Sequence, residues 1–85
     1  TTEDGSLTAP TLTSLLKIGS SNEAVKQIQL RLNQLGYNCG TADGIFGSRT
    51  GTAVRSFQSN AGLTVDGIVG NDTLNALYNS SAPRA

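Results

Sequence analysis

The feature that most constrains this chain is an internal repeat. Residues 43–50 read DGIFGSRT and residues 66–73 read DGIVGNDT, so aspartate, glycine, isoleucine, glycine and threonine recur at matching positions. The preceding segments also correspond, because Gln29 and Gln58 each follow an apolar residue. A chain of 85 residues has room for one small domain. The repeat therefore predicts helix, Asp-Gly turn, helix, Asp-Gly turn, helix, which is an all-α fold and a compact three-helix bundle.

Apolar spacing and helix-end signals predict where these helices lie. Ser20 followed by Glu23 has the spacing of a capping box and predicts the start of the first helix. Apolar residues then recur every three or four positions, and Gly36 supplies a stop. Residues 10–18 hold several leucines and are predicted as either a helical turn or an extended segment. The three predicted helices span residues 20–35, 48–61 and 71–78.

The repeated residues have structural roles that follow from their chemistry. Gly44 and Gly67 suit left-handed backbone, and the aspartates before them can accept amide hydrogen bonds within their turns. The amides of Gln29 and Gln58 are expected to reach the neighbouring loop backbone. The residues predicted as turn structure are Asp43, Gly44, Gly47, Asp66, Gly67 and Gly70. Four apolar loop residues are expected to face the core: Ile45, Phe46, Ile68 and Val69.

Two functional interpretations of the repeated aspartates compete with turn structure. Asp43 and Asp66 could be the acid and the base of a glycosidase. An acid and a base need surroundings that separate their pKa values, whereas a repeat gives both carboxyl groups similar surroundings. A calcium loop would need alternating oxygen ligands, and apolar residues occupy those places. Turn structure is therefore favoured over catalysis and over calcium binding.

Composition excludes several classes of function. The chain has no histidine and one cysteine, Cys39, which rules out Ser–His–Asp and Cys–His nucleophiles and a Cys/His zinc site. We expect Cys39 to be a small packed residue. Six basic residues balance six acidic ones, which argues against a nucleic-acid surface. No apolar run approaches the roughly 18 residues that a membrane span needs. We therefore expect no catalytic residues, no metal, no cofactor, no nucleic acid and no membrane partner.

The polar ends of the chain frame the predicted domain. Residues 1–10 are predicted to be an N-terminal tail or linker, residues 11–80 the domain and residues 81–85 a C-terminal tail. The sequence contains no methionine, so we expect a processed product or a piece of a larger protein. The domain is expected to be a monomer.

Three blocks of sequence, in this order, are typical of one family. The first ends in LGY after an Ile-Gln pair, the second opens on DGIFG and ends in FQ, and the third contains VDGIVG. Together they resemble the peptidoglycan-binding domain 1 family. Members of that family often have proline and tryptophan where this chain has Asn71 and Leu74. The blocks span residues 25–37, 43–58 and 62–77.

The resemblance implies a three-helix, non-catalytic module that tethers enzymes to the bacterial cell wall. Such enzymes include amidases, muramidases, zinc carboxypeptidases, L,D-transpeptidases and phage endolysins. We therefore expect binding to the glycan or the stem peptide of peptidoglycan, and a covalently attached catalytic domain in the parent protein. The protein is expected to be secreted and associated with the cell wall, with a bacterial or a phage endolysin origin. The alternative is a propeptide-like module that packs on, or inhibits, its own enzyme domain.

The expected peptidoglycan-binding face joins the first turn to the start of the second helix. Tyr37 is expected to stack on a sugar, and Arg49 to pair with a carboxylate of the stem peptide. Asp43, Ser48 and Thr50 are expected to offer polar contacts.

Overall fold

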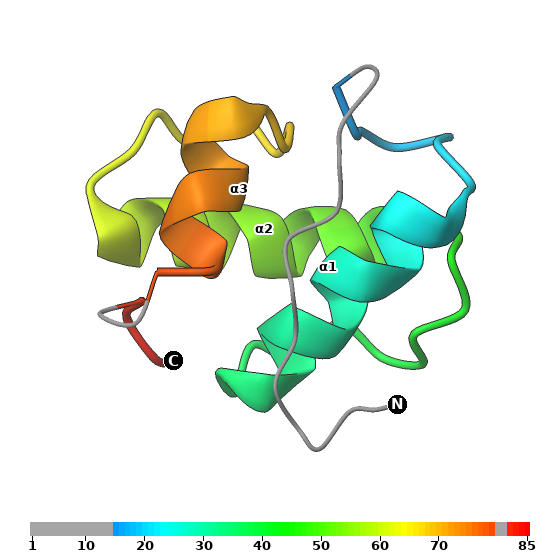
Figure 1. Cartoon of the computed structure of the whole chain (residues 1–85), viewed down its shortest axis with the longest axis horizontal. Helices are drawn as coiled ribbons and strands as arrows, with labels where there is room; N and C mark the ends of the chain where they lie inside the picture. The colour runs from blue at the N-terminus through cyan, green and yellow to red at the C-terminus, as the bar shows by residue number, and fades with distance from the viewer. Residues whose placement is uncertain (1–14, 80–81) are drawn as a thin grey trace.

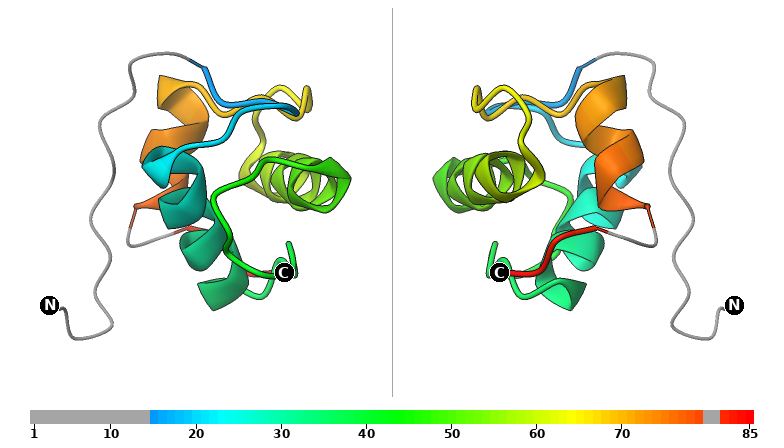
Figure 2. Two further views of the ribbon diagram at one scale, coloured as in Figure 1. Left: turned by 90° about the vertical axis from the view of Figure 1, so that its right-hand side faces the viewer. Right: turned by 90° about the vertical axis from the view of Figure 1, so that its left-hand side faces the viewer.

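The fold is three helices joined by the two repeat loops. The computed structural model describes residues 15–79 and 82–85, and its helices are α1 (Glu23–Gln34), α2 (Ser48–Ala61) and α3 (Asn71–Leu77) (Figure 1). Figure 2 shows α1 and α3 on one side of α2. The prediction of an all-α three-helix fold is confirmed, and the second and third helices lie within one residue of their predicted bounds.

The core gathers apolar side chains from every helix and from both loops. Burial of such side chains away from water is the main favourable contribution to folding. Phe46 and Val69 are buried as predicted, but Ile45 is 59% exposed and Ile68 is half-buried. Successive residues of an extended segment point to opposite sides, so only one of each loop pair can enter the core. The apolar side chains that are at most 1% exposed are Val25, Ile28, Leu32, Phe46, Val54, Phe57, Val69 and Leu77.

The first helix begins later than the capping-box spacing predicts. Asn22 is its N-cap, and the Asn22 side chain accepts a hydrogen bond from the amide of Val25 at 3.0 Å. The predicted cap, Ser20, instead accepts from the amide of Lys17 at 3.1 Å, and its carbonyl accepts from the amide of Phe46 at 2.8 Å. The chain at Ser20 is therefore paired with the first repeat loop, and the capping-box prediction is wrong.

Glycine ends the first two helices in the same way. Gly36 and Gly62 have positive φ angles of 94° and 74°. The amides of Tyr37 and Leu63, which follow these glycines, donate back to carbonyls of the last helical turn, both at 2.9 Å. This is the Schellman arrangement, in which a left-handed residue lets the chain satisfy the final carbonyls of a helix. The predicted glycine stops are confirmed.

Residues 15–21 form a bridge between the two repeat loops. Leu16 pairs with Val69 through two backbone hydrogen bonds of 3.1 and 2.8 Å, and Ser21 pairs with Ile45. Of the two predictions for residues 10–18, the extended one fits Leu16, whereas residues 10–14 lie outside the described chain. The bridge fixes the two loops relative to each other.

The last residues of the chain lie against the end of α1. The carbonyl of Pro83 accepts a hydrogen bond from the hydroxyl of Tyr37 at 2.9 Å, and the amide of Ala85 donates to the carbonyl of Leu35 at 3.0 Å. The described part of the predicted C-terminal tail, residues 82–85, is thus in contact with the domain. The predicted N-terminal tail, residues 1–10, lies outside the described residues. Within residues 15–79 and 82–85, no helix is long and apolar enough to cross a membrane.

Candidate functional site

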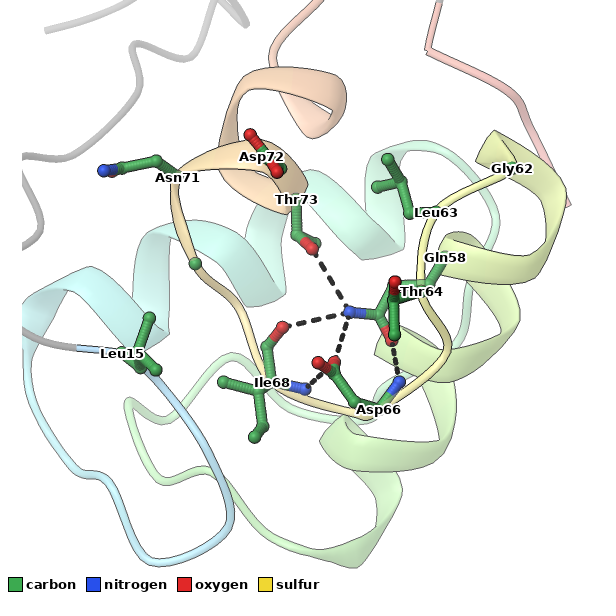
Figure 3. Close-up of a pocket in the computed structure, with 11 residues that line it drawn as sticks. Leu15, Gln58, Gly62, Leu63, Thr64, Asp66, Ile68, Asn71, Asp72 and Thr73 are labelled. Atoms are coloured by element: carbon green, nitrogen blue, oxygen red, sulfur yellow. Dashed lines mark hydrogen bonds between the residues drawn. The ribbon is translucent and has the colours of Figure 1, made fainter.

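Each repeat builds one hollow on the surface between a helix and its loop. The second-repeat hollow has a volume of about 560 Å³ and lies between the end of α2 and the start of α3 (Figure 3). Its walls include Leu15, Asp66, Asn71 and Asp72. The first-repeat hollow has a volume of about 290 Å³ and lies at the matching place between α1 and α2.

A buried glutamine holds the floor of the second-repeat hollow. The Nε2 of Gln58 donates to Oδ1 of Asp66 at 2.9 Å, to the carbonyl of Ile68 at 3.0 Å and to Oγ1 of Thr73 at 3.2 Å (Figure 3). Its Oε1 accepts from the amides of Asp66 at 3.1 Å and Gly67 at 2.9 Å. Both ends of the amide are therefore used, as a buried polar group requires.

The first repeat has the same network around Gln29. The Nε2 of Gln29 donates to the carbonyl of Ile45 and to Oγ1 of Thr50, both at 2.9 Å, and to Oδ1 of Asp43 at 3.4 Å. Its Oε1 accepts from the amide of Gly44 at 2.9 Å. The prediction that the two glutamine amides reach the neighbouring loop backbone is confirmed.

The two repeated aspartates have similar surroundings. Oδ1 of Asp43 accepts from the amide of Ile45, and Oδ1 of Asp66 accepts from the amide of Ile68, both at 2.9 Å. These backbone hydrogen bonds lower the pKa of each carboxyl group below its usual value of 3.8. Both are thus ionised at neutral pH, so neither is held as the protonated acid of a glycosidase pair. Each aspartate therefore stabilises its own turn by accepting a backbone hydrogen bond.

Tyr37 does not lie where sugar stacking would need it. Its side chain is 4% exposed, and its ring meets the ring of Phe57 edge-on with centroids 5.5 Å apart. Its hydroxyl donates to the carbonyl of Pro83 and accepts from Nδ2 of Asn60, each at 2.9 Å. The expectation of a stacking tyrosine is corrected, because the side chain is almost fully buried and its hydroxyl is already bonded.

The other four predicted site residues do come together in the first-repeat hollow. Asp43, Ser48, Arg49 and Thr50 all line it, together with Gln29. Ser48 and Arg49 are exposed, whereas Thr50 is 2% exposed and its hydroxyl faces the buried glutamine. Arg49 is therefore the cation at the rim of this hollow, and Thr50 supports its floor.

The matching residues of the second repeat, Asn71 and Asp72, are absent from the predicted site. Aligning DGIFGSRT with DGIVGNDT pairs Ser48 with Asn71 and Arg49 with Asp72, and this alignment was the signal that could have located them. Both residues line the larger hollow. The two repeats thus carry opposite charges at the equivalent position, Arg49 in the first and Asp72 in the second.

Cys39 is a packed residue. Its thiol lies 3.4 Å from the carbonyl oxygen of Gln29 and 3.4 Å from Oδ1 of Asn33, and burial raises its pKa above the usual value. It is therefore a protonated thiol at neutral pH. Among the residues that the structure describes, no group of three or more Cys, Asp or Glu residues is placed to hold a metal ion.

Curated proteins with similar sequences are cell-wall enzymes by name. The chain is 47% identical over 73 residues to the zinc D-Ala-D-Ala carboxypeptidase of Streptomyces albus G, covering 80% of this chain and 28% of that protein. It is 46% identical over 54 residues to the N-acetylmuramoyl-L-alanine amidase CwlM of Mycobacterium tuberculosis, covering 64% of this chain and 13% of that protein. The chain thus spans little more than a quarter, or less, of these relatives.

Solved structures with a similar fold point to the same family. A fused zinc-dependent amidase, peptidase and peptidoglycan-binding protein from Clostridium acetobutylicum aligns with a TM-score of 0.78 and 43% identity, covering 85% of this chain and 33% of that one. The N-terminal domain of SleB aligns with a TM-score of 0.76 and 38% identity, covering 80% of this chain and 93% of that one. Residues 21–77 match the family model described as "Putative peptidoglycan binding domain". The chain belongs to this peptidoglycan-binding family, whose members are binding domains and not catalytic ones.

Proposed function

We propose that this domain binds peptidoglycan and targets an attached cell-wall enzyme to it. The observation that carries the proposal is the family match over residues 21–77. It is supported by the relatives, which by name are an amidase and a carboxypeptidase and of which this chain matches only a small part. Tethering raises the local concentration of substrate for an attached enzyme without adding any chemistry of its own.

The first-repeat hollow is the proposed contact with the stem peptide. Arg49 is exposed at its rim, and the aliphatic part of its side chain lies against Gly40, where a Cβ would be 3.3 Å from Cδ of Arg49. That packing limits the conformations of a side chain that would otherwise be mobile. A guanidinium can pair with a carboxylate through two parallel hydrogen bonds. Asp43 and Ser48 supply polar groups beside it.

Binding to purified sacculi tests this function. The wild-type domain should sediment with sacculi, and Arg49→Ala should weaken binding by roughly fivefold, which is the scale of an exposed ion pair. Arg55→Ala is the matched control, because Arg55 is an exposed arginine of the same helix that lines neither hollow. Wild-type protein that stays in the supernatant would contradict the proposed function. Equal binding by Arg49→Ala and Arg55→Ala would contradict only the role of Arg49.

The propeptide-like alternative is favoured by one observation. Four large apolar side chains of the 15–21 bridge and of the loops are at least half exposed, namely Leu15, Ile18, Ile45 and Val65. Apolar surface of this kind is typical of an interface with another domain. On this alternative, the isolated domain added to its own catalytic domain should inhibit it, whereas a targeting module should leave hydrolysis of a small soluble substrate unchanged.

A further inference from the structure

Each repeat loop contains an Asp-Gly pair, and such a pair is open to a spontaneous reaction of the backbone. The backbone nitrogen of the glycine can attack the side-chain carboxyl carbon of the aspartate before it. Glycine allows this approach most readily, because it has no Cβ in the way. In both loops the aspartate is exposed to water, whereas the glycine is buried. The carboxyl group is therefore accessible, and the nitrogen that could attack it lies against the interior.

The turn geometry brings the two reacting groups together. Oδ1 of Asp43 accepts from the amide of Ile45 at 2.9 Å, and Oδ1 of Asp66 accepts from the amide of Ile68 at the same distance. A hydrogen bond from an aspartate to the amide two residues later closes a ring that contains the nitrogen of the intervening residue. In each loop that residue is the glycine, so the carboxyl group is folded back beside the nitrogen that can attack it.

The reaction is a cyclisation followed by a hydrolysis. In the second repeat, the nitrogen of Gly67 would form a bond to Cγ of protonated Asp66, and the carboxyl hydroxyl would leave as water with the amide proton. Water would then open the resulting succinimide at the main-chain carbonyl carbon of Asp66, and that carbon would become the new carboxyl group. The chain would remain connected through Cγ, as β-linked isoaspartate. One water is released and one is consumed, so no oxidant or cofactor is needed.

Gln58 opposes the first step in the second repeat. Its Oε1 accepts from the amide of Gly67 at 2.9 Å and from the amide of Asp66 at 3.1 Å (Figure 3). The nitrogen of Gly67 must lose its proton and turn toward Cγ to react, which would break a buried hydrogen bond. The hydrogen bonds from Ile68 and Gln58 also lower the pKa of the Asp66 carboxyl group. The ionised carboxylate has no hydroxyl to lose.

Gln29 holds the first repeat in the same way. Its Oε1 accepts from the amide of Gly44 at 2.9 Å. Gly44 is also packed closely against the start of α1, since a Cβ there would lie 3.2 Å from the backbone oxygen of Asn22. Gln29 and Gln58 are each 1% exposed, so water does not compete with them for the glycine amides. Each glycine nitrogen is thus fixed by a buried acceptor.

We propose that the Asp-Gly pair of each repeat is a site of spontaneous aspartate isomerisation, and that the buried glutamine of that repeat suppresses the reaction by holding the glycine amide. The pairs are Asp43–Gly44, held by Gln29, and Asp66–Gly67, held by Gln58. The glutamines then have a kinetic role in addition to their contribution to the fold. They protect the chemical integrity of the loops over time.

Isomerisation would damage the surface that the first repeat presents. The Cβ of Asp43 would enter the backbone, and the carboxylate would move away from the amide of Ile45. Asp43 and Arg49 line the same hollow, so the lengthened loop would displace one wall of it. This modification depends on no ligand, and it would occur whether or not the domain binds peptidoglycan.

Peptide mapping of the whole chain after long incubation at neutral pH tests this role. Mass spectrometry after chromatography counts normal and β-linked aspartate at each pair, and the quantity compared is the ratio of the two rates within one molecule. Global unfolding exposes both pairs together, so lost stability alone leaves this ratio unchanged. Gln58→Leu should shift the ratio about tenfold toward Asp66, and Gln29→Leu about tenfold toward Asp43, which is the scale of one lost buried hydrogen bond.

Thr73→Val is the matched control for Gln58→Leu. It removes a partner of the glutamine Nε2 but leaves Oε1 as the acceptor for Gly67, so the ratio should stay at the wild-type value. Short peptides that contain DGIFG or DGIVG supply the rate of an unfolded pair. The wild-type chain should react at least about tenfold more slowly than these peptides at both pairs.

Opposite shifts in the two glutamine variants, with Thr73→Val like wild type, support the protective role. Equal acceleration at both pairs in a folded glutamine variant overturns it, and so does a Thr73→Val shift as large as that of Gln58→Leu. A variant that unfolds reacts at the peptide rate at both pairs, and the comparison of wild type with the peptides then decides. Wild-type protein that isomerises as fast as the peptides overturns the suppression, whatever the variants do.

Discussion

The first and second repeats place a buried glutamine against a loop carbonyl and a threonine hydroxyl in the same way. Gln29 and Gln58 lie at 2.9 and 3.0 Å from the carbonyls of Ile45 and Ile68, and each accepts from the amide of the turn glycine at 2.9 Å. The two repeats differ at the rim, where Arg49 of the first corresponds to Asp72 of the second. The interior network is thus duplicated, whereas the charge presented to a ligand is not.

This difference separates residues that hold the fold from residues that can recognise a ligand. A substitution inside either network removes partners from buried polar groups, so it should act on the free energy of unfolding. A substitution at Arg49 or Asp72 leaves these networks intact, so it should act on binding.

Replacing either buried glutamine should cause the largest loss of stability. Gln58→Leu keeps the approximate volume but leaves the amides of Asp66 and Gly67 without their acceptor. We expect the free energy of unfolding in urea to fall by about 3 kcal/mol, because several buried groups lose partners together. Gln29→Leu should cost a similar amount, since its network makes four of the same contacts.

Gln27→Leu is the matched control for the glutamine variants. Gln27 is half-buried on α1, and its side chain bonds to Glu23 at the exposed surface of the same helix. Its replacement should change the free energy of unfolding by no more than about 0.5 kcal/mol. If Gln27→Leu lowered the free energy of unfolding as much as Gln29→Leu does, the buried networks would contribute no more to stability than an exposed hydrogen bond.

The two turn glycines should differ in their response to alanine. Gly44 and Gly67 have φ angles of +81° and +74°, which cost an alanine about 1–2 kcal/mol. A Cβ on Gly44 would also lie 3.2 Å from the backbone oxygen of Asn22, whereas a Cβ on Gly67 would meet the side-chain end of Arg55 at 2.9 Å. A side chain can move away and a backbone cannot, so we expect losses of about 2–3 kcal/mol for Gly44→Ala and about 1–2 kcal/mol for Gly67→Ala. Thermal unfolding would measure both, and the reverse order would contradict this explanation.

The threonines should give a smaller and more equal loss. Thr50→Val and Thr73→Val keep the shape of the side chain but remove an acceptor of the glutamine amide. The glutamine keeps its other partners in each variant, so we expect about 1 kcal/mol for each in urea unfolding. Thr52→Val, at an exposed position of α2, is the control and should lie within about 0.5 kcal/mol of wild type.

The sequence predicts those features of the fold and the site that depend on residues close together along the chain. The ends of α1 and α2 follow from Gly36 and Gly62, because a left-handed residue after a helix is a local requirement. The glutamine networks could be expected from the repeat, since the same residues recur at the same spacing. The four clustered residues of the first-repeat hollow lie within eight positions of one another, so their proximity is also local.

Two of the errors involve partners that are distant in the sequence. Ser20 fails as a cap because its carbonyl pairs with Phe46, 26 positions later. Tyr37 is removed from the binding face because Pro83, 46 positions later, returns to accept its hydroxyl. Periodicity and capping signals carry no information about such contacts.

The repeated aspartates should give the smallest effect, which appears only in acid. The pKa values of Asp43 and Asp66 are lowered in the folded state by the amides of Ile45 and Ile68. Since each folded pKa lies below the unfolded value near 3.8, their stabilisation is fully present above that value and is lost as the pH falls through the folded pKa. The free energy of unfolding of the wild-type domain should therefore decline as the pH is lowered below about 4.

Replacing these two aspartates with asparagine removes the charge while keeping an acceptor for the turn amide. Asp43→Asn and Asp66→Asn keep an oxygen that can accept from the loop amide, but neither titrates, so each should make the acid decline shallower. Because each carboxyl group accepts the same loop-amide hydrogen bond at 2.9 Å, the two variants should flatten the curve by similar amounts, and the double variant by about the sum. Urea unfolding at several pH values between 2 and 6 would measure the slopes. A strong effect of one variant alone would mean that one aspartate has a role beyond its turn, and would break the equivalence of the two repeat interiors.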